Sequence, residues 1–465
     1  MTDADVLIVG GGPVGLTARA LLARWGVRTL LVEKHRELSP FPRSRLVNVR
    51  TMEIFRHLGI ADTVRDRAFA PEFGRVRFRD TLLDRDFATA AMIGVDGPIP
   101  DSPEFGVVTS QDRLEPTLVA AADGPIRFGV ECTELSEQDD CVVATFRDGS
   151  TASVRYVIAA DGANSPTRQR LGVEAVGPGA LARMTTVVFD ADLRQWSADQ
   201  PAGVYFTANG MFAPVYPEGG WAWINATTED ADHAGLVARA IGADVPATVL
   251  RVQNWVVNAF VAKHFRQGRI FLAGDAAHTV PGAGGLGMNT GVAGVHNLCW
   301  KLAGVLEGWA EPGLLETYES ERQPVAQLTL RQAVANTMLM RSAQQQRQEQ
   351  LQAGEVAPDK VELPWSERYF AQLGLVLGVT YGSSAEPGTD YMPSTEPGSR
   401  MPHRLLPDGR STLDAVGEWF TLFTTSPQDV DSPWPIRVVH DPEAHEPLLV
   451  RPDGHIADPA VFTRR

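Results

Sequence analysis

Short runs of consecutive apolar residues alternate with segments of helical spacing at the start of the chain. Residues 5–9 (DVLIV) form one such run, and residues 28–34 (RTLLVEK) form the next. Between them, the apolar positions of LTARALLARWG recur at helical spacing up to Gly26. A continuous apolar run is typical of a strand buried on both faces of a sheet. The pattern therefore predicts a strand–helix–strand unit within a parallel sheet.

Two later apolar runs each end in an adjacent aspartate and glycine, in opposite order. The run VRYVIAADG ends at Asp161 and Gly162, and the run FLAGD ends at Gly274 and Asp275. A glycine-rich turn and then the helical pattern GVAGVHNLCWKLAGVL follow the second run. Because parallel strands place their carboxyl ends along one edge of a sheet, we expect these turns to converge.

The middle and the end of the chain follow other patterns. Residues 74–105 and 180–265 alternate aromatic or β-branched residues with polar ones, which predicts a second sheet with one apolar face. The segment RQAVANTMLMRSAQQQRQEQLQ predicts an amphipathic helix, and a linker rich in proline, glycine and serine lies near residues 383–400.

Composition narrows the class of protein. The 465 residues carry a net charge of -15, so the chain lacks the basic character that nucleic acid or an anionic membrane selects. Three cysteines are too few and too widely spaced for a disulfide framework or a zinc site. The apolar N-terminal stretch has no basic flank and is broken by glycines, so it predicts neither a signal peptide nor a membrane span. We expect a soluble, cytoplasmic protein that binds neither nucleic acid nor membrane.

The turn after the first strand carries a dinucleotide-binding fingerprint. Gly10, Gly12 and Gly15 have the spacing GxGxxG, and Glu33 ends the next strand. Gly10 permits the tight turn, Gly12 lets a pyrophosphate approach the backbone, and Gly15 lets the helix pack on the strand. Glu33 can accept hydrogen bonds from a ribose diol, which favours FAD or NAD over NADP at this turn. The turn alone does not separate FAD from NAD.

The three motifs together resemble those of FAD-dependent aromatic hydroxylases of the para-hydroxybenzoate hydroxylase fold, and most of all its polyketide-hydroxylase branch. The resemblance covers nearly the whole chain. It implies an α/β fold in which a Rossmann-like FAD-binding domain carries an inserted β-sheet substrate domain and a shortened thioredoxin-like C-terminal segment. This last segment lacks a CxxC motif, so it implies no thiol redox role.

The implied domains divide the chain as follows. Residues 1–73, 106–179 and 266–325 form the discontinuous FAD-binding domain, and residues 74–105 and 180–265 form the substrate-binding sheet. Residues 326–393 form a helical support and linker, and residues 394–465 form the thioredoxin-like segment.

The implied cofactor contacts combine the motif residues with positions matched to the family. Asp275 is expected to accept a hydrogen bond from a ribityl hydroxyl, and the following glycines let main-chain N–H groups approach the flavin. One departure is Gly294, where relatives commonly have an aspartate. The predicted cofactor-binding residues are Gly10, Gly12, Val14, Gly15, Glu33, Lys34, Arg45, Gln111, Asp161, Asp275, Pro281, Gly285, Gly287, Met288 and Asn289.

The resemblance also implies a reaction. NADPH or NADH reduces the flavin, O2 then gives a C4a-hydroperoxide, and its distal oxygen attacks an aromatic ring. No second dinucleotide fingerprint appears, so the nicotinamide donor is expected to bind transiently. The aromatic residues of the second sheet suit a flat, polycyclic, polyketide-type substrate of antibiotic biosynthesis, and the alternative for any single one is packing in the core beneath the sheet. The substrate candidates are Met211, Phe212, Pro214, Trp221 and Trp223.

Other questions stay open at this level. Tyr205, Tyr216 and His233 are alternatives for a base that ionises a phenol, and His278 is at least as well explained by structure. The chain is expected to be a monomer or a homodimer. Baeyer–Villiger oxygen insertion is a close alternative to hydroxylation. A flavin-dependent halogenase is disfavoured because GWAWIN has Asn225 where that class has proline, and a flavoprotein that only sequesters an aromatic drug is a further alternative.

Overall fold

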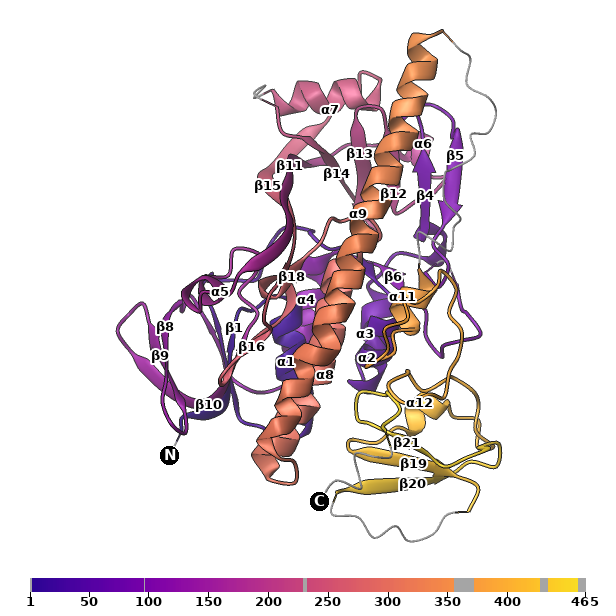
Figure 1. Ribbon diagram of the computed structural model, residues 1–465. Helices are drawn as coiled ribbons and strands as arrows, with labels where there is room; N and C mark the ends of the chain where they lie inside the picture. The colour runs from indigo at the N-terminus through magenta and orange to yellow at the C-terminus, as the bar shows by residue number, and fades with distance from the viewer. Residues whose placement is uncertain (1, 96, 229–231, 355–371, 427–433, 459–465) are drawn as a thin grey trace.

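The computed structural model describes residues 2–95, 97–228, 232–354, 372–426 and 434–458. Within them, three layers of structure follow one another along the long axis in Figure 1: a β-sheet domain at the top, a helix-covered parallel sheet in the middle and a small C-terminal sheet below. A single long helix, α9 (Thr317–Gln352), runs from the middle layer to the top one. The mixed α/β architecture agrees with the predicted fold class.

The middle layer is built on the parallel sheet that the apolar runs predict. Its strand order is β16-β17-β10-β1-β2-β7, with the hairpin β8–β9 attached to β10. Neighbours from β17 to β7 are parallel. The strands are β1 (Ala4–Val9), β2 (Thr29–Glu33), β7 (Ile126–Phe128), β8 (Cys132–Glu137), β9 (Val142–Phe146), β10 (Thr151–Ala159), β16 (Arg266–Gln267) and β17 (Ile270–Leu272).

Both faces of this sheet are covered, which explains its continuous apolar runs. Val6, Ile8 and Leu31 belong to the main core with helices α1 and α8, whereas Leu7 and Leu30 pack with the β8–β9 hairpin. The helices of this layer are α1 (Pro13–Arg24), α2 (Val49–His57), α3 (Ala61–Asp66), α4 (Gln111–Ala120), α5 (Pro166–Arg170) and α8 (Leu286–Glu307). Short pieces β3 (Leu46–Val47), β6 (Val107–Val108), η2 (Gly274–Ala276) and η3 (Pro312–Glu316) complete it.

Helix α8 differs from its prediction at one end. The spacing of apolar residues places its start near Gly291, but the helix begins at Leu286, directly after Gly285 in a left-handed conformation (φ 63°). The glycine-rich stretch therefore supplies the first turn of the helix as well as the loop. Met288 and Asn289 lie within that first turn.

The upper layer is an eight-stranded sheet in the order β18-β15-β11-β14-β13-β12-β4-β5. Helix α7 (His233–Ile241) packs on one face, and α9 reaches the sheet through hydrogen bonds from Gln344 to Thr207 and from Arg347 to Asp80. The strands are β4 (Arg75–Phe78), β5 (Ala88–Ala91), β11 (Ala175–Asp190), β12 (Val204–Thr207), β13 (Gly210–Tyr216), β14 (Gly219–Ala226), β15 (Thr248–Ala262) and β18 (His278–Thr279). The short helices η1 (Pro71–Phe73) and α6 (Arg194–Ser197) flank it.

The C-terminal layer is a three-stranded sheet in the order β20-β19-β21, formed by β19 (Phe420–Thr424), β20 (Ile436–His440) and β21 (Leu448–Val450). Tryptophans attach it to the middle layer: Trp419 lies 5.8 Å from Trp25 and 5.0 Å from Trp309 between ring centroids. The helices α11 (Leu373–Leu377) and α12 (Thr412–Ala415) lie on the same side of the molecule. Among the described residues, no helix is both long enough and apolar enough to cross a membrane.

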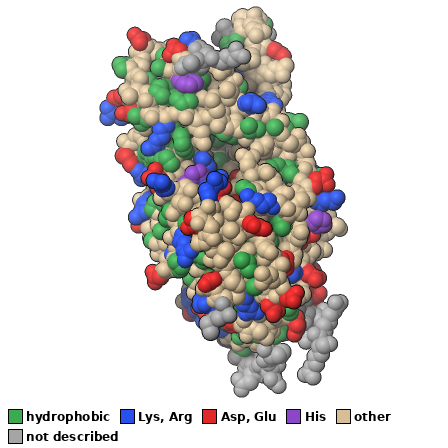
Figure 2. Space-filling view, turned by 90° about the vertical axis from the view of Figure 1, so that its left-hand side faces the viewer, with side chains coloured by type: hydrophobic (Ala, Val, Ile, Leu, Met, Phe, Trp, Pro, Cys, Tyr) green, Lys and Arg blue, Asp and Glu red, His purple; other side chains and the backbone are tan. Residues whose placement is uncertain are grey.

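Figure 2 shows one face of the molecule, on which cationic, anionic and apolar side chains are interspersed. No field of a single charge covers this face.

Candidate functional site

Three strand ends meet along one edge of the parallel sheet. Strands β17, β10, β1 and β2 are direct neighbours in that order, and Val9 lies beside both Ala159 and Val32 in the register. Ala159 in turn lies beside Leu272. The GxGxxG turn and the two turns that contain Asp161 and Asp275 therefore converge, as the sequence predicts.

The glycines of the first turn have separate roles. A side chain at Gly10 would place its Cβ 2.2 Å from the carbonyl oxygen of Ala160, and one at Gly15 would place it 2.0 Å from the carbonyl oxygen of Gly10. Gly10 also has a φ of 112°. At Gly12, by contrast, no protein atom lies within 4 Å of the Cβ position. Gly10 and Gly15 thus shape the turn, and Gly12 leaves space in front of it.

The start of helix α1 is free to bind an anion. Gly12 is its N-cap and offers no side-chain oxygen, and its first turn holds no acidic residue. The first-turn N–H groups of a helix have no partner within the helix, and its dipole favours negative charge there. Val14, in this first turn, packs against Gly274 and Gly291, which would each clash with it if they carried a Cβ.

Glu33 is held in place at the end of β2. Its Oε2 accepts a hydrogen bond from the backbone N–H of Gly11 at 2.7 Å, and its Oε1 accepts one from the backbone N–H of His35 at 2.9 Å. Oε1 also lies 2.7 Å from Nδ1 of His35, whereas Oε2 keeps a second lone pair with which it can accept from a ribose diol. The adjacent Lys34 is exposed.

Asp275 combines an exposed side chain with a raised pKa. Its side chain is exposed, yet desolvation by the surrounding protein raises its pKa to about 6, an effect that the nearby Arg43 guanidinium only partly opposes. No hydrogen bond satisfies this carboxylate in the described structure, so it would gain from a hydroxyl donor of a bound ligand.

Asp161 is engaged differently, although it also follows a strand. Its two oxygens accept hydrogen bonds from the Ser165 hydroxyl at 2.5 Å and from the backbone N–H of Thr167 at 3.0 Å. The side chain thus holds the turn and the start of α5. Arg168, which the sequence does not single out, donates to the carbonyl oxygens of Ala276 and Ala163, both at 2.9 Å, and so ties the two aspartate turns together.

The loop before α8 is held by the side chain of Asn289. Its amide nitrogen donates to the carbonyl oxygens of Leu46 at 2.9 Å and Gly285 at 2.7 Å, and its Oδ1 accepts from the backbone N–H of Asn48 at 2.9 Å. Gly282 is exposed with no protein atom within 4 Å of its Cβ position, whereas Gly287 lies against Val280. Pro281 is buried and Met288 half-buried. Asn289 therefore fixes the loop against the segment that contains Leu46 and Asn48, whereas the backbone at Gly282 is accessible.

Arg45 bridges the two larger layers. Its guanidinium donates to the carbonyl oxygen of Gly203 at 2.6 Å and to that of Pro214, while its Nε has no partner among the described residues. Burial lowers the pKa of Arg45 to about 10. These contacts hold Arg45 in the interior between the two layers rather than at the surface.

Gln111 is oriented by a carboxyl group that sequence reasoning missed. Its amide donates to Oε1 of Glu115 at 2.7 Å, one helical turn away. Burial raises the pKa of Glu115 to about 7, although hydrogen bonds and the charge of Arg43 oppose the shift, and its Oε2 has no side-chain or backbone partner in the described structure. The i, i+4 spacing within a helix was the only sequence signal for this pair.

The substrate candidates of the second sheet lie on two faces. Phe212, Trp221 and Trp223 are buried together in the cluster beneath α7. Met211 instead packs with the cluster that includes Phe206 and reaches Leu46, beside the glycine-rich loop. Pro214 is buried, and its carbonyl oxygen accepts from Arg45. Trp221 and Trp223 share a face, as their spacing predicts.

The histidine and tyrosine candidates differ in their surroundings. Tyr205 is fully buried and donates to the carbonyl oxygen of Gln200 at 2.8 Å, and burial raises its pKa to about 12. Tyr216 donates to Asp112 at 2.5 Å, so its hydroxyl proton is already used in a hydrogen bond. His233 begins α7 on the outside of the second sheet. Burial lowers the pKa of His278 to about 3, so its ring is neutral.

The arrangement fits an elongated dinucleotide. Four features lie along one edge of the sheet: the uncapped start of α1 with empty space at Gly12, the carboxylate of Glu33, the exposed carboxylate of Asp275 and the open glycine loop. FAD requires a pyrophosphate site, a ribose acceptor, an acceptor for its ribityl hydroxyls and main-chain donors for its ring. The residues present supply each of these.

Comparison with known proteins agrees with this geometry. The profile of a family described as "FAD binding domain" matches residues 3–333. Aklavinone 12-hydroxylase RdmE of Streptomyces purpurascens is 33% identical over 90% of this chain and 83% of that protein. Tetracenomycin B2 monooxygenase-dioxygenase of Streptomyces olivaceus is 33% identical over 93% of this chain and 85% of that protein.

Solved structures extend the likeness to the whole fold. The crystal structure of the flavin-dependent monooxygenase PieE, in complex with FAD and substrate, superposes with a TM-score of 0.84 at 31% identity. The match covers 98% of this chain and 96% of that one, so it includes the C-terminal layer.

Proposed function

The chain belongs to the FAD binding domain family, and on that premise we propose that it is an FAD-dependent, NAD(P)H-consuming monooxygenase that hydroxylates a polycyclic aromatic substrate. The observation that carries the proposal is the convergence of three strand-end turns on one edge of the parallel sheet, beneath a second sheet with an apolar inner cluster.

The residues of the chain bind and orient the cofactor. The first-turn N–H groups of α1, next to Gly12, bind the pyrophosphate, and Glu33 accepts from the adenosine ribose. Asp275 accepts from a ribityl hydroxyl, and the loop from Gly282 to Gly287 presents its backbone to the ring. FAD, when bound, supplies the activation of O2 that no side chain can perform.

The aromatic substrate is proposed to bind between the glycine loop and the cluster that contains Met211. This cluster is apolar and built largely from phenylalanines, among them Phe78, Phe87 and Phe206, so it excludes water and offers flat contact surfaces. Leu46 connects it to the loop, where a Cβ on Gly285 would lie 2.7 Å from the Cβ of Leu46. An aromatic polyketide is the substrate class that this lining and the named relatives favour.

The nicotinamide donor is proposed to bind transiently, because the chain has one GxGxxG fingerprint and that turn serves FAD. We also propose a cytoplasmic location, in keeping with the three cysteines, all of which are free. A monomer or a homodimer is the expected form.

The experiment that tests the proposal uses the flavin-loaded protein, NADPH or NADH, isotopically labelled O2 and a panel of polycyclic phenols. We expect at least one phenol to accelerate nicotinamide oxidation and to yield a product that carries one labelled oxygen atom as a new hydroxyl group. A labelled lactone would identify Baeyer–Villiger insertion instead. Oxidation that no aromatic compound accelerates would contradict the proposal.

A further inference from the structure

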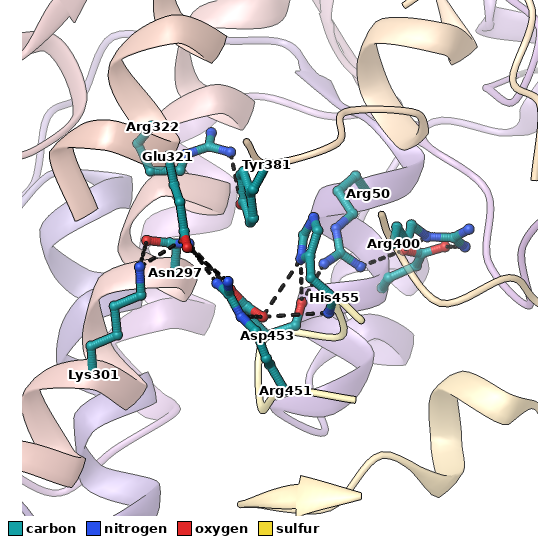
Figure 3. A network of polar contacts seen from close by, with 11 residues as sticks. Arg50, Asn297, Lys301, Glu321, Arg322, Tyr381, Arg400, Arg451, Asp453 and His455 are labelled. Carbon is teal, nitrogen blue, oxygen red and sulfur yellow. Dashed lines mark hydrogen bonds and ion pairs between the residues drawn. The ribbon is translucent and has the colours of Figure 1, made fainter. Parts of the chain in front are cut away.

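A buried network of charged residues joins the C-terminal layer to helices α8 and α9 (Figure 3). Glu321 of α9 accepts from Arg451 at 2.8 Å and 2.9 Å and from Lys301 at 2.7 Å. Asp453 accepts from Arg451 at 2.6 Å. Each of these two carboxylates is thus already paired with a cationic side chain.

The same network continues to helix α2. Glu53 accepts from Arg50 at 2.8 Å and from Arg400 at 3.0 Å, and both arginines are mostly buried. Together with the residues above and Arg322, the described network holds five cationic side chains and three carboxylates. The network therefore carries an excess of positive charge. The neighbouring histidines cannot offset it, because a histidine side chain is either neutral or positive.

Arg322 is the cation of this network without a carboxylate. It is only 5% exposed, and it donates to the hydroxyl of Tyr381 and to the carbonyl oxygen of Thr290, both at 3.1 Å. Its Nε has no partner within the described residues, which also place no carboxylate within ion-pair distance of it. An uncompensated guanidinium in the interior is costly, so a negative partner is expected.

The space that such a partner needs is present. Arg322 and Tyr381 line a cavity of about 50 Å³, whereas a single water molecule needs roughly 10–15 Å³. On the adjoining face of α8, Gly294 leaves further room: the nearest atoms to its Cβ position are Nε of Arg322 and the Tyr318 hydroxyl oxygen, each 3.9 Å away. Tyr381 accepts from Arg322, so its own proton remains available for donation.

We propose that this cavity binds a small monovalent anion such as chloride, held by Arg322 and the Tyr381 hydroxyl. The lining combines apolar side chains, such as Val325 and Leu375, with two further cations, Arg50 and Arg400. The one carboxylate among its described residues, Asp453, is already paired with Arg451, and the small volume suits a monatomic anion. The anion takes the place that a carboxylate at position 294 could otherwise occupy. It completes the charge balance of the network that connects the C-terminal layer to α8 and α9.

The test measures thermal unfolding rather than activity, so its outcome does not depend on the proposed function. The full-length protein is unfolded in increasing sodium chloride, with sodium gluconate holding the ionic strength constant. The wild type is expected to gain roughly 2–4 °C in a saturable manner. Gly294→Asp, which supplies a fixed carboxylate, is expected to unfold at a higher temperature in gluconate and to lose the response to chloride.

Gly294→Asn is the matched control, because it fills the same space without a charge. It is expected to lack the stabilisation in gluconate that Gly294→Asp gains. Crystals of the wild type grown in sodium bromide provide the direct measurement, with an anomalous peak expected beside Arg322. Identical unfolding in chloride and gluconate, or a water molecule in place of bromide, would overturn the proposal.

Discussion

Two aspartates that follow neighbouring strands are expected to respond in opposite ways to the same substitution. Asp275 is exposed and has no hydrogen-bond partner in the described structure, whereas Asp161 accepts two hydrogen bonds within its own turn. Replacing Asp275 by alanine should therefore stabilise the FAD-free protein and weaken FAD binding. Replacing Asp161 by alanine should destabilise the FAD-free protein.

The magnitude follows from the contacts. A rise in the pKa of Asp275 from 3.8 to about 6 corresponds to about 3 kcal/mol of unfavourable burial at neutral pH. Because the side chain is accessible to solvent, we reduce this to roughly 1–2 kcal/mol. The folded protein binds this proton more tightly than the unfolded chain, so the penalty is absent below pH 3.8 and develops as the pH rises to 6.

The loss of FAD affinity reflects a hydrogen bond to a charged acceptor, which contributes roughly 1.5–3 kcal/mol. Asp275→Ala should thus raise the dissociation constant for FAD roughly ten- to a hundredfold. Asp161→Ala loses two accepted hydrogen bonds and should lower the unfolding free energy by about 1–2 kcal/mol.

The assay combines urea unfolding of the FAD-free proteins with FAD titration followed by quenching of flavin fluorescence. Unfolding of the wild type and Asp275→Ala at pH 4, near the unshifted pKa, and at pH 7, above the shifted pKa, checks the sign: the stabilisation should be present at pH 7 and nearly absent at pH 4. The reasoning is refuted if Asp275→Ala destabilises the FAD-free protein and binds FAD as tightly as the wild type does.

Three further outcomes are expected. Burial alone would raise the pKa of Glu53, but the charges of Arg400 and Arg50 outweigh it and lower the pKa from 4.5 to about 2. About 3 kcal/mol of stability is therefore present above pH 4.5 and lost as the pH falls toward 2, and Glu53→Gln should abolish this part of the acid transition in urea unfolding. Gly12→Ala should weaken FAD binding without changing the stability of the FAD-free protein, whereas Gly10→Ala should lower that stability because its Cβ would meet a carbonyl oxygen at 2.2 Å; paired unfolding and FAD titrations distinguish them. Trp221→Ala should cost roughly 3–5 kcal/mol of unfolding free energy as a core truncation, whereas Met211→Ala should mainly change which phenols stimulate NADPH oxidation.

Much of the cofactor-binding architecture is predictable from the sequence because it depends on local rules. Continuous apolar runs predict buried parallel strands, and parallel neighbours bring their carboxyl ends to one edge. The tight contacts of Gly10 and Gly15 likewise follow from the fingerprint spacing. The start of α8 was missed by several residues, since glycines in a first helical turn resemble a loop in the sequence.

The differing roles of chemically identical residues are not predictable in this way. Asp161 and Asp275 both follow a strand and adjoin a glycine, and only the surrounding turns decide which carboxylate is left without a partner. Strand alternation places Trp221 and Trp223 on one face but does not state which face meets α7. The Glu53–Arg400 pair joins residues 347 positions apart, a separation over which no sequence pattern acts.

The central claim is that one FAD molecule lies along the three strand-end turns with its ring beneath the second sheet. The measurement that tests it most directly is a crystal structure of the protein with FAD. We predict a pyrophosphate at the N-terminus of α1, a ribityl hydroxyl within hydrogen-bonding distance of Asp275, and the ring against the loop from Gly282 to Gly287. A flavin bound elsewhere, or one whose ring is open to bulk water with no space for an aromatic compound beside it, would contradict the account.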